Sequence, residues 1–232
     1  MTYRDTDLPL TNTKKEHCSK SCDERMNRMG VEWNPARSAL VIVDVQNDYC
    51  HKDGSIAKQG LDVSMAEQML PNLKQMIRTC KENNVPVIYI QTIHEDSTDS
   101  KTWVKRLKNK TQKDLCRKNT WGSEFFHLAP EDEDVIVIKH RYSAFINTRF
   151  DSVLRAMEID TLLMAGVSTN ICVESTARDG FMLDYDILLL SDCTGAFTRE
   201  EYDMSLKTID KFFGSVTSSA EIMESLKREV QV

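Results

Sequence analysis

The chain has 232 residues, 41% of them hydrophobic and 28% charged, a composition typical of one folded domain with a buried core. A formal net charge of −6 without a basic stripe argues against a nucleic-acid partner. No apolar run reaches the ~20 residues that cross a bilayer, and the polar N-terminus lacks a signal-peptide core, so we expect a cytosolic protein with no membrane partner.

The predicted elements begin after a polar, charged stretch. Residues 1–36 lack a clear hydrophobic period and are interpreted as an N-terminal arm, ahead of one domain at 37–232. In chain order, we expect a strand at 38–44, a helix at 64–83, a strand at 85–91, a polar stretch at 93–130, a strand at 134–139, a helix at 148–158, a strand at 161–166, a helix at 170–183, a strand at 186–191, and helices at 200–213 and 219–227. Apolar strands that alternate with helices predict an α/β fold, a three-layer α/β/α sandwich around a mostly parallel sheet.

The seven cysteines show neither a standard zinc spacing nor a CxxC pair. In a reducing cytosol they are expected to be mostly free thiols. His17, Cys18 and Cys22 supply only half of a possible metal cluster, so a metal site is disfavoured there.

Three polar residues lie where predicted strands end. Asp44 closes the first strand, Lys139 closes the third, and Cys172 follows the fourth. Open α/β sheets bind their ligands beyond the carboxyl ends of the strands. Because each of these strands is otherwise apolar, we expect the three side chains to face one crevice.

The segment from Gly166 to Cys172 favours a nucleophilic cysteine. Its glycine permits a sharp turn, and Cys172 is expected in the first turn of a helix that begins near Asn170. The amides and dipole of a helix start favour an anion, so we predict a lowered thiol pKa and an oxyanion site beside it. Asp44 is placed to take the thiol proton and return it to a leaving nitrogen, while Lys139 keeps Asp44 ionised.

Three sequence blocks resemble the isochorismatase-like cysteine hydrolases: VIVDVQNDYC, IKHRYSAFINT and GVSTNICVESTARDGF. The resemblance covers nearly all of residues 36–215 and is strongest to the ureidoacrylate amidohydrolases of that superfamily. It implies an enzyme without a cofactor and a catalytic triad that falls on Asp44, Lys139 and Cys172.

The same resemblance implies a cis peptide between Val167 and Ser168, and an oxyanion hole made by the backbone amides of Ser168 and Cys172. The metal-binding nicotinamidases of the superfamily carry an aspartate–histidine cluster. His94 could match one of those ligands, but no partner histidines occur near Asp62, so we predict no metal.

Four residues are candidates to contact the substrate, and each is also compatible with ordinary packing. They are Gln91, at the end of the second strand, and the aromatic residues Trp121, Tyr142 and Phe145. The polar stretch at 93–130 is long enough to cover an active site. Its sequence differs from the ureidoacrylate enzymes over 92–120, so the identity of the substrate stays open.

The sequence thus predicts a cysteine-dependent amidohydrolase that cleaves a C–N bond of a small ureido or carboxamide substrate through a thioester. Nicotinamidase-like and carbamoylsarcosine- or biuret-type activities are alternatives, as is a catalytically inactive binding protein of the same fold. A thiol redox protein is disfavoured by the missing CxxC pair. The resemblance also implies a homo-oligomer, either a dimer or a tetramer.

Overall fold

The computed structural model describes residues 33–107 and 113–229. From Trp33 onward these residues form one compact unit, in which the tryptophan itself is buried. The predicted arm lies almost wholly outside the described residues, as do His17, Cys18 and Cys22. The boundary of the arm at residue 36 stays a prediction.

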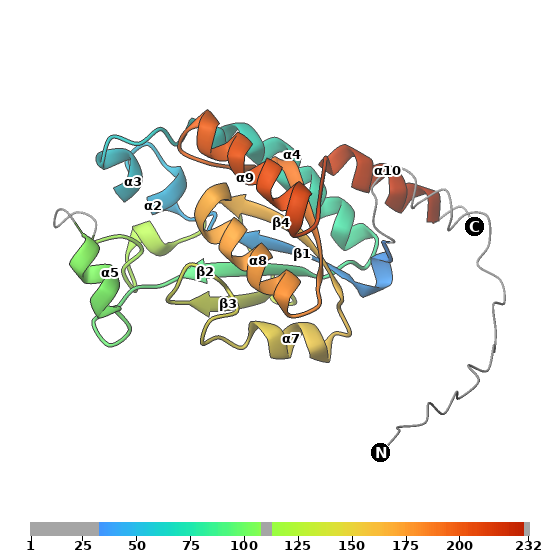
Figure 1. Ribbon diagram of the computed structural model, residues 1–232, viewed down its shortest axis with the longest axis horizontal. Helices are drawn as coiled ribbons and strands as arrows, with labels where there is room; N and C mark the ends of the chain where they lie inside the picture. The colour runs from blue at the N-terminus through green and yellow to red at the C-terminus, as the bar shows by residue number, and fades with distance from the viewer. Residues whose placement is uncertain (1–32, 108–112, 230–232) are drawn as a thin grey trace, which may run out of the picture. The chain divides into compact units, whose positions relative to one another are not determined.

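The centre of the unit is a sheet of six parallel strands, which confirms the predicted fold class (Figure 1). The strand order is β3-β2-β1-β4-β5-β6. The strands are β1 Ser38–Val43, β2 Val87–Thr92, β3 Val135–Lys139, β4 Thr161–Val167, β5 Asp186–Gly195 and β6 Ser215–Thr217. The sequence pattern predicts all of them except β6, whose three residues form no apolar run.

Helices cover both faces of the sheet (Figure 1). One face carries α7 Phe150–Ala156, α8 Glu174–Met182 and α9 Arg199–Phe212, and the other carries α4 Ser64–Glu82 and α10 Ser219–Glu229. Short helical segments lie in the connections: η1 Pro35–Arg37, α2 Asn47–Cys50, α3 Ser55–Lys58, α5 Lys101–Arg106, η2 Trp121–Ser123 and η3 Thr169–Val173. These are too short to show a helical period in the sequence. Within the described residues, no helix combines the length and apolar character that a membrane crossing requires.

The strand order reverses between β1 and β4. From β1 the chain adds β2 and β3 on one side, then returns to add β4, β5 and β6 on the other. In open α/β sheets, such a reversal leaves a crevice at the carboxyl ends of the two central strands, where ligands bind. Asp44 follows β1 and Cys172 follows β4, so both lie at this crevice.

Gly166 lets the two central strands approach each other beside the crevice. Its φ is +110°, and a Cβ at this position would lie 2.0 Å from the carbonyl oxygen of Val43. Because that oxygen belongs to the backbone of β1, a larger residue would push β4 away from β1. The glycine therefore sets the spacing of the strands that carry Asp44 and Cys172.

The segment between β2 and β3 is fastened to the body of the protein at defined points. His94 and Arg117 form a parallel bridge, in which the amide of His94 donates to Cys116 at 2.9 Å and the amide of Lys118 donates to His94 at 3.0 Å. The amide of Cys116 also donates to Asp48 Oδ2 at 2.7 Å, and Asp48 is buried in α2. A buried carboxylate thus holds this covering segment to the helix that follows β1.

Candidate active site

Three residues predicted from the sequence meet at the crevice. Lys139 Nζ lies 2.7 Å from Asp44 Oδ2 and 3.5 Å from Cys172 Sγ. The exposed fractions are 0% for Asp44, 1% for Lys139 and 4% for Cys172. Asp44 adopts a left-handed φ of +53°, an uncommon conformation for a residue other than glycine and one that recurs at functional sites. We call these three residues the Asp–Lys–Cys cluster.

Two further polar residues hold the cluster in place. Thr92, the last residue of β2, accepts a hydrogen bond from Lys139 Nζ at 2.8 Å and donates one to Asp44 Oδ1 at 2.9 Å. The buried side chain of Gln46 donates to the carbonyls of Thr92 and Ser123 and accepts from the amide of Thr92. These partners are 46 or more positions apart in the chain, so the sequence pattern does not reveal them.

The charge of the cluster follows from its contacts. Burial lowers the pKa of the Lys139 ammonium, but the negative charge of Asp44 and the contact with Cys172 outweigh burial, so the pKa of Lys139 is raised. Lys139 is therefore an ammonium at neutral pH. Since a buried charge is tolerated only beside its counterion, the ammonium and the Asp44 carboxylate depend on each other.

Cys172 lies in the π-helical turn η3, which runs directly into α8. Burial raises the pKa of the thiol, the ammonium of Lys139 lowers it, and the carboxylate of Asp44 raises it, with a strongly raised pKa as the result. The predicted lowering of this pKa is therefore wrong, because the loss of water around the sulfur outweighs the favourable field of a helix start. The thiol is protonated at neutral pH, and a nucleophilic role requires a base that takes its proton.

The turn that carries the thiol has the predicted backbone geometry. The peptide bond between Val167 and Ser168 is cis, as the resemblance implies. Ser168 is the N-cap residue of η3 and Cys172 lies inside it, so the two amides expected to form the oxyanion hole border the same turn. Their role as oxyanion donors stays a prediction.

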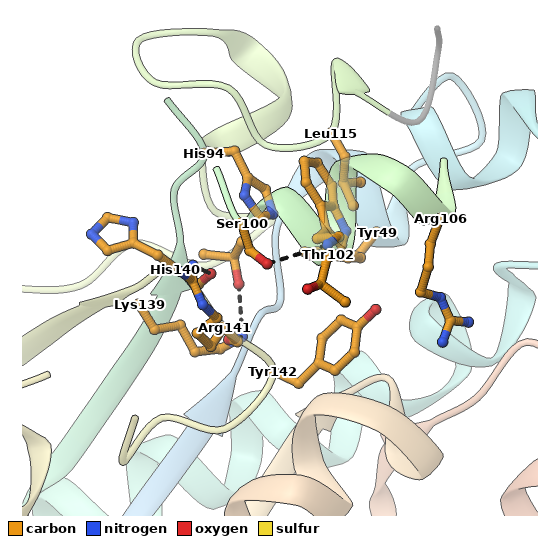
Figure 2. Close-up of a pocket in the computed structure, with 12 residues that line it drawn as sticks. Tyr49, His94, Ser100, Thr102, Arg106, Leu115, Lys139, His140, Arg141 and Tyr142 are labelled. Carbon is orange, nitrogen blue, oxygen red and sulfur yellow. Dashed lines mark hydrogen bonds between the residues drawn. The ribbon is translucent and has the colours of Figure 1, made fainter. Parts of the chain in front are cut away.

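A cavity of about 240 Å³ opens beside the cluster (Figure 2). Lys139 and Thr92 form part of its wall, and no aspartate or glutamate is among the described residues that line it. Figure 2 shows Lys139 and Arg106 on opposite sides of this cavity. Other lining residues come from α2, the covering segment and the loop after β3, among them Tyr49, His94, Trp103, Arg141 and Tyr142.

Of the four candidate substrate contacts, Tyr142 lines this cavity. Gln91 does not, and its side chain donates to the carbonyl of Ser123 at 2.8 Å. Trp121 also lies outside the cavity lining, with 46% of its surface exposed and its ring edge-on to His51. The side chain of Gln91 thus bonds to the connection between β2 and β3, and Trp121 packs from that connection against His51.

Phe145 packs into the core against Phe150 and Tyr185, with ring centroids 4.7 and 5.7 Å apart. Packing, the alternative weighed for this residue, is what the structure shows. Sequence reasoning missed Trp103 and Arg106, which line the cavity from α5. A tryptophan within a polar stretch is the signal that could have pointed to this wall.

His94 is placed as a packing residue. Its ring stacks on Trp103 with 4.3 Å between centroids, and its Nδ1 lies 3.7 Å from Asp99 Oδ1. Within residues 33–107 and 113–229, no group of three or more histidine, cysteine, aspartate or glutamate side chains is arranged to hold a metal ion.

Acid is expected to destabilise the protein through His94. Burial lowers its pKa from 6.5 to about 4, and the charge of Asp99 offsets only part of this shift. The unfolded chain takes up this proton at a higher pH than the folded one, so the free energy of unfolding falls as the pH drops from 6.5 toward 4, by at most about 3 kcal/mol. Thermal unfolding of His94→Gln should depend less steeply on pH over this range.

The matched control for this measurement is His127→Gln, because His127 is an exposed histidine of the loop after η2. It should keep the wild-type dependence of the melting temperature on pH. A wild-type dependence in His94→Gln as well would contradict the assignment of this acid sensitivity to His94.

The chain is similar to several known proteins. A family model described as the isochorismatase domain matches residues 38–221. The ureidoacrylate amidohydrolase RutB of Pseudomonas syringae pv. syringae is 35% identical over 203 residues, which cover 81% of this chain and 83% of the relative. RutB of Acinetobacter baylyi is 32% identical over 217 residues, which cover 87% and 89%. Among solved structures, a cysteine hydrolase from Pseudomonas syringae pv. phaseolicola has a TM-score of 0.74 at 29% identity, over 84% of this chain and 95% of the other.

Proposed function

Because the chain belongs to the isochorismatase family, we propose that it is an amidohydrolase in which Cys172 attacks the carbonyl of a small ureido or carboxamide substrate. The observation that carries the proposal is the position of Lys139 Nζ, 2.7 Å from the Asp44 carboxylate and 3.5 Å from the Cys172 sulfur. Relatives named ureidoacrylate amidohydrolase support a C–N bond outside peptides as the target, and ureidoacrylate as the first compound to test.

The first half of the proposed reaction forms a thioester. The proton of the Cys172 thiol passes to the Asp44 carboxylate, and the sulfur bonds to the carbonyl carbon of the substrate. The amides of Ser168 and Cys172 donate to the oxyanion of the tetrahedral intermediate. Asp44 then returns the proton to the leaving nitrogen, the C–N bond breaks, and the acyl group stays on the sulfur.

The second half releases the acyl group. A water molecule gives a proton to Asp44, and the oxygen of that water bonds to the thioester carbon. The C–S bond then breaks, and the thiolate of Cys172 regains the proton from Asp44. The ammonium of Lys139 stabilises the thiolate in both halves, because it lies within 3.5 Å of the sulfur. The raised thiol pKa fits this role, since the thiolate exists only while Asp44 holds its proton.

Ammonia release from a panel of ureidoacrylate, nicotinamide, carbamoylsarcosine and biuret tests the proposed function. We expect turnover of at least one compound, with ureidoacrylate preferred. Trapping of an acyl group on Cys172 by acid quench and peptide mass spectrometry tests the thioester. A protein that releases ammonia from none of these compounds, although folded, would favour the inactive binding protein.

Arg106 is expected to favour substrates that carry a carboxylate. Its guanidinium lines a cavity in which the described residues place no acidic side chain, and a charge-assisted hydrogen bond to a carboxylate is strong. Arg106→Ala should raise KM for ureidoacrylate by roughly tenfold and leave KM for uncharged nicotinamide unchanged. Lys105→Ala is the matched control, because Lys105 is exposed on the same helix and does not line the cavity. Equal KM changes in the two variants would contradict this role.

Dialysis against a chelator is expected to leave turnover unchanged, because the proposed steps use a thiol, a carboxylate and an ammonium. The measurement is the rate of ammonia release before and after dialysis on whichever compound of the panel responds. A loss of activity that zinc restores would show that the metal-free prediction is wrong and would point to His94 as a ligand.

A further inference from the structure

We propose that Thr92 is the positioning residue of the Asp–Lys–Cys cluster. Its hydroxyl determines which oxygen of Asp44 takes the thiol proton. The inference rests on the proposed function of the cluster, but it concerns a residue that neither the sequence motifs nor the resemblance assigns. Thr92 is 2% exposed and lies in direct contact with both charged members of the cluster.

The sheet order explains why Thr92 occupies this place. Lys139 ends β3, Thr92 ends β2 and Asp44 follows β1, and these strands are neighbours in that order. Thr92 is the register partner of Lys139 in the β2–β3 pair. The threonine therefore stands between the ammonium and the carboxylate at the carboxyl edge of the sheet.

The direction of the two hydrogen bonds is fixed by chemistry. An ammonium can only donate, so the bond of 2.8 Å from Lys139 Nζ uses a lone pair of the Thr92 oxygen. A carboxylate can only accept, so the bond of 2.9 Å to Asp44 Oδ1 uses the single proton of the Thr92 hydroxyl. Asp44 Oδ1 thus already accepts a hydrogen bond from Thr92.

The other carboxylate oxygen is left open. The donors of Lys139 point to Thr92 Oγ1 at 2.8 Å, to the carbonyl of Arg141 at 2.9 Å and to Cys172 Sγ at 3.5 Å. Asp44 Oδ2 lies 2.7 Å from Nζ as an ion pair, but no donor among the described residues meets it with aligned hydrogen-bond geometry, and the Asp44 carboxylate also interacts with the Cys172 thiol. Since the Thr92 hydroxyl already bonds to Oδ1, Oδ2 is the oxygen that we assign as the acceptor of the Cys172 proton.

Removing the hydroxyl would undo this arrangement. In Thr92→Val, Oδ1 loses its donor and Lys139 Nζ loses an acceptor. The freed N–H of Lys139 lies within reach of Oδ2 and would bond to it, because the two atoms are 2.7 Å apart. Oδ2, the oxygen assigned as the base, would then be held by Lys139 while Oδ1 stands without a donor, so the proton of Cys172 would have to pass to a different oxygen and its transfer would slow.

The experiment compares Thr92→Val with Thr92→Ser, which keeps the hydroxyl and removes only a methyl group. We expect Thr92→Val to lower kcat by roughly 10²-fold with KM unchanged, the scale of a general base that is no longer available. Thr92→Ser should restore kcat to within about threefold of the wild type. Thr161→Val is the matched control, because Thr161 is buried at the opposite, amino end of β4 and should keep wild-type kcat.

Alkylation of Cys172 by iodoacetamide, followed by mass spectrometry, gives a second measurement that needs no substrate. The rate constant at pH 7.5 should fall about tenfold in Thr92→Val and stay near the wild type in Thr92→Ser and Thr161→Val. Should no amide of the panel react while alkylation still depends on the Thr92 hydroxyl, the proposed function fails and the positioning role stands. Wild-type kcat and alkylation in Thr92→Val, or equal losses in Thr92→Ser, overturn the positioning role.

Discussion

Replacing Cys172 with alanine is expected to lower kcat on a responsive amide by roughly 10⁴- to 10⁶-fold, the loss typical of a missing nucleophile. Without the sulfur no thioester can form, and the remaining groups can only orient the substrate and polarise its carbonyl. Ammonia release measures the loss. Substrate binding, measured by calorimetry, should be retained, because the change from cysteine to alanine leaves the cavity walls in place.

Cys193→Ala is the matched control for this variant. Cys193 is a free and fully buried cysteine of β5, like Cys172 in burial but outside the Asp–Lys–Cys cluster. It should keep kcat near the wild type, even if the truncation lowers the melting temperature. Turnover that survives in Cys172→Ala would mean that another group is the nucleophile.

Replacing Lys139 with methionine is expected to damage both folding and catalysis. The change leaves the Asp44 carboxylate buried without its cation, a situation that costs about 3–5 kcal/mol in unfolding free energy. The melting temperature should fall by roughly 10 °C. The kcat should fall by roughly 10²-fold or more, since the thiolate loses the ammonium that stabilises it.

The loss of stability in Lys139→Met is expected to depend on pH. Without Lys139 the buried Asp44 side chain has no cation beside it, and burial then favours its neutral, protonated form in the folded protein. The folded form then binds a proton that the unfolded form has lost, so stability is greater at low pH and falls as the pH rises. The deficit of Lys139→Met should therefore be larger at pH 8 than at pH 5.

A double variant separates folding from chemistry. In Asp44→Asn/Lys139→Met neither buried residue carries a charge, so most of the lost stability should return. Activity should not return, because the asparagine cannot take the thiol proton. Recovery of turnover together with stability would show that Asp44 and Lys139 serve packing only.

The sequence predicts the strands of this fold best where burial makes a strand uniformly apolar. Every residue of β1 and β4 is buried, and both strands stand out as unbroken runs. β5 is harder, because it continues past the polar Ser191 and Asp192 to Gly195. That extension depends on pairing with β4, which a local pattern cannot show.

The residues of the candidate site also differ in how well the sequence predicts them. Asp44, Lys139 and Cys172 could be predicted, because each is a reactive residue next to an apolar strand and the strand ends share an edge. Thr92 could not, since a threonine at a strand end is ordinary and its importance comes from partners 47 and 48 positions away. The raised thiol pKa escaped prediction as well, because burial is a property of the packed protein.

The attachment of the covering segment has a consequence for how this protein could be altered. His94 and Cys116 pair through their backbones at the base of this segment, where the amide of Cys116 also meets the Asp48 carboxylate at 2.7 Å. Because the two anchor points lie side by side, a change in the length of the chain between them is expected to add little entropic cost to folding. New loops grafted between these anchors could redirect the choice of substrate while the reacting groups beneath stay in register.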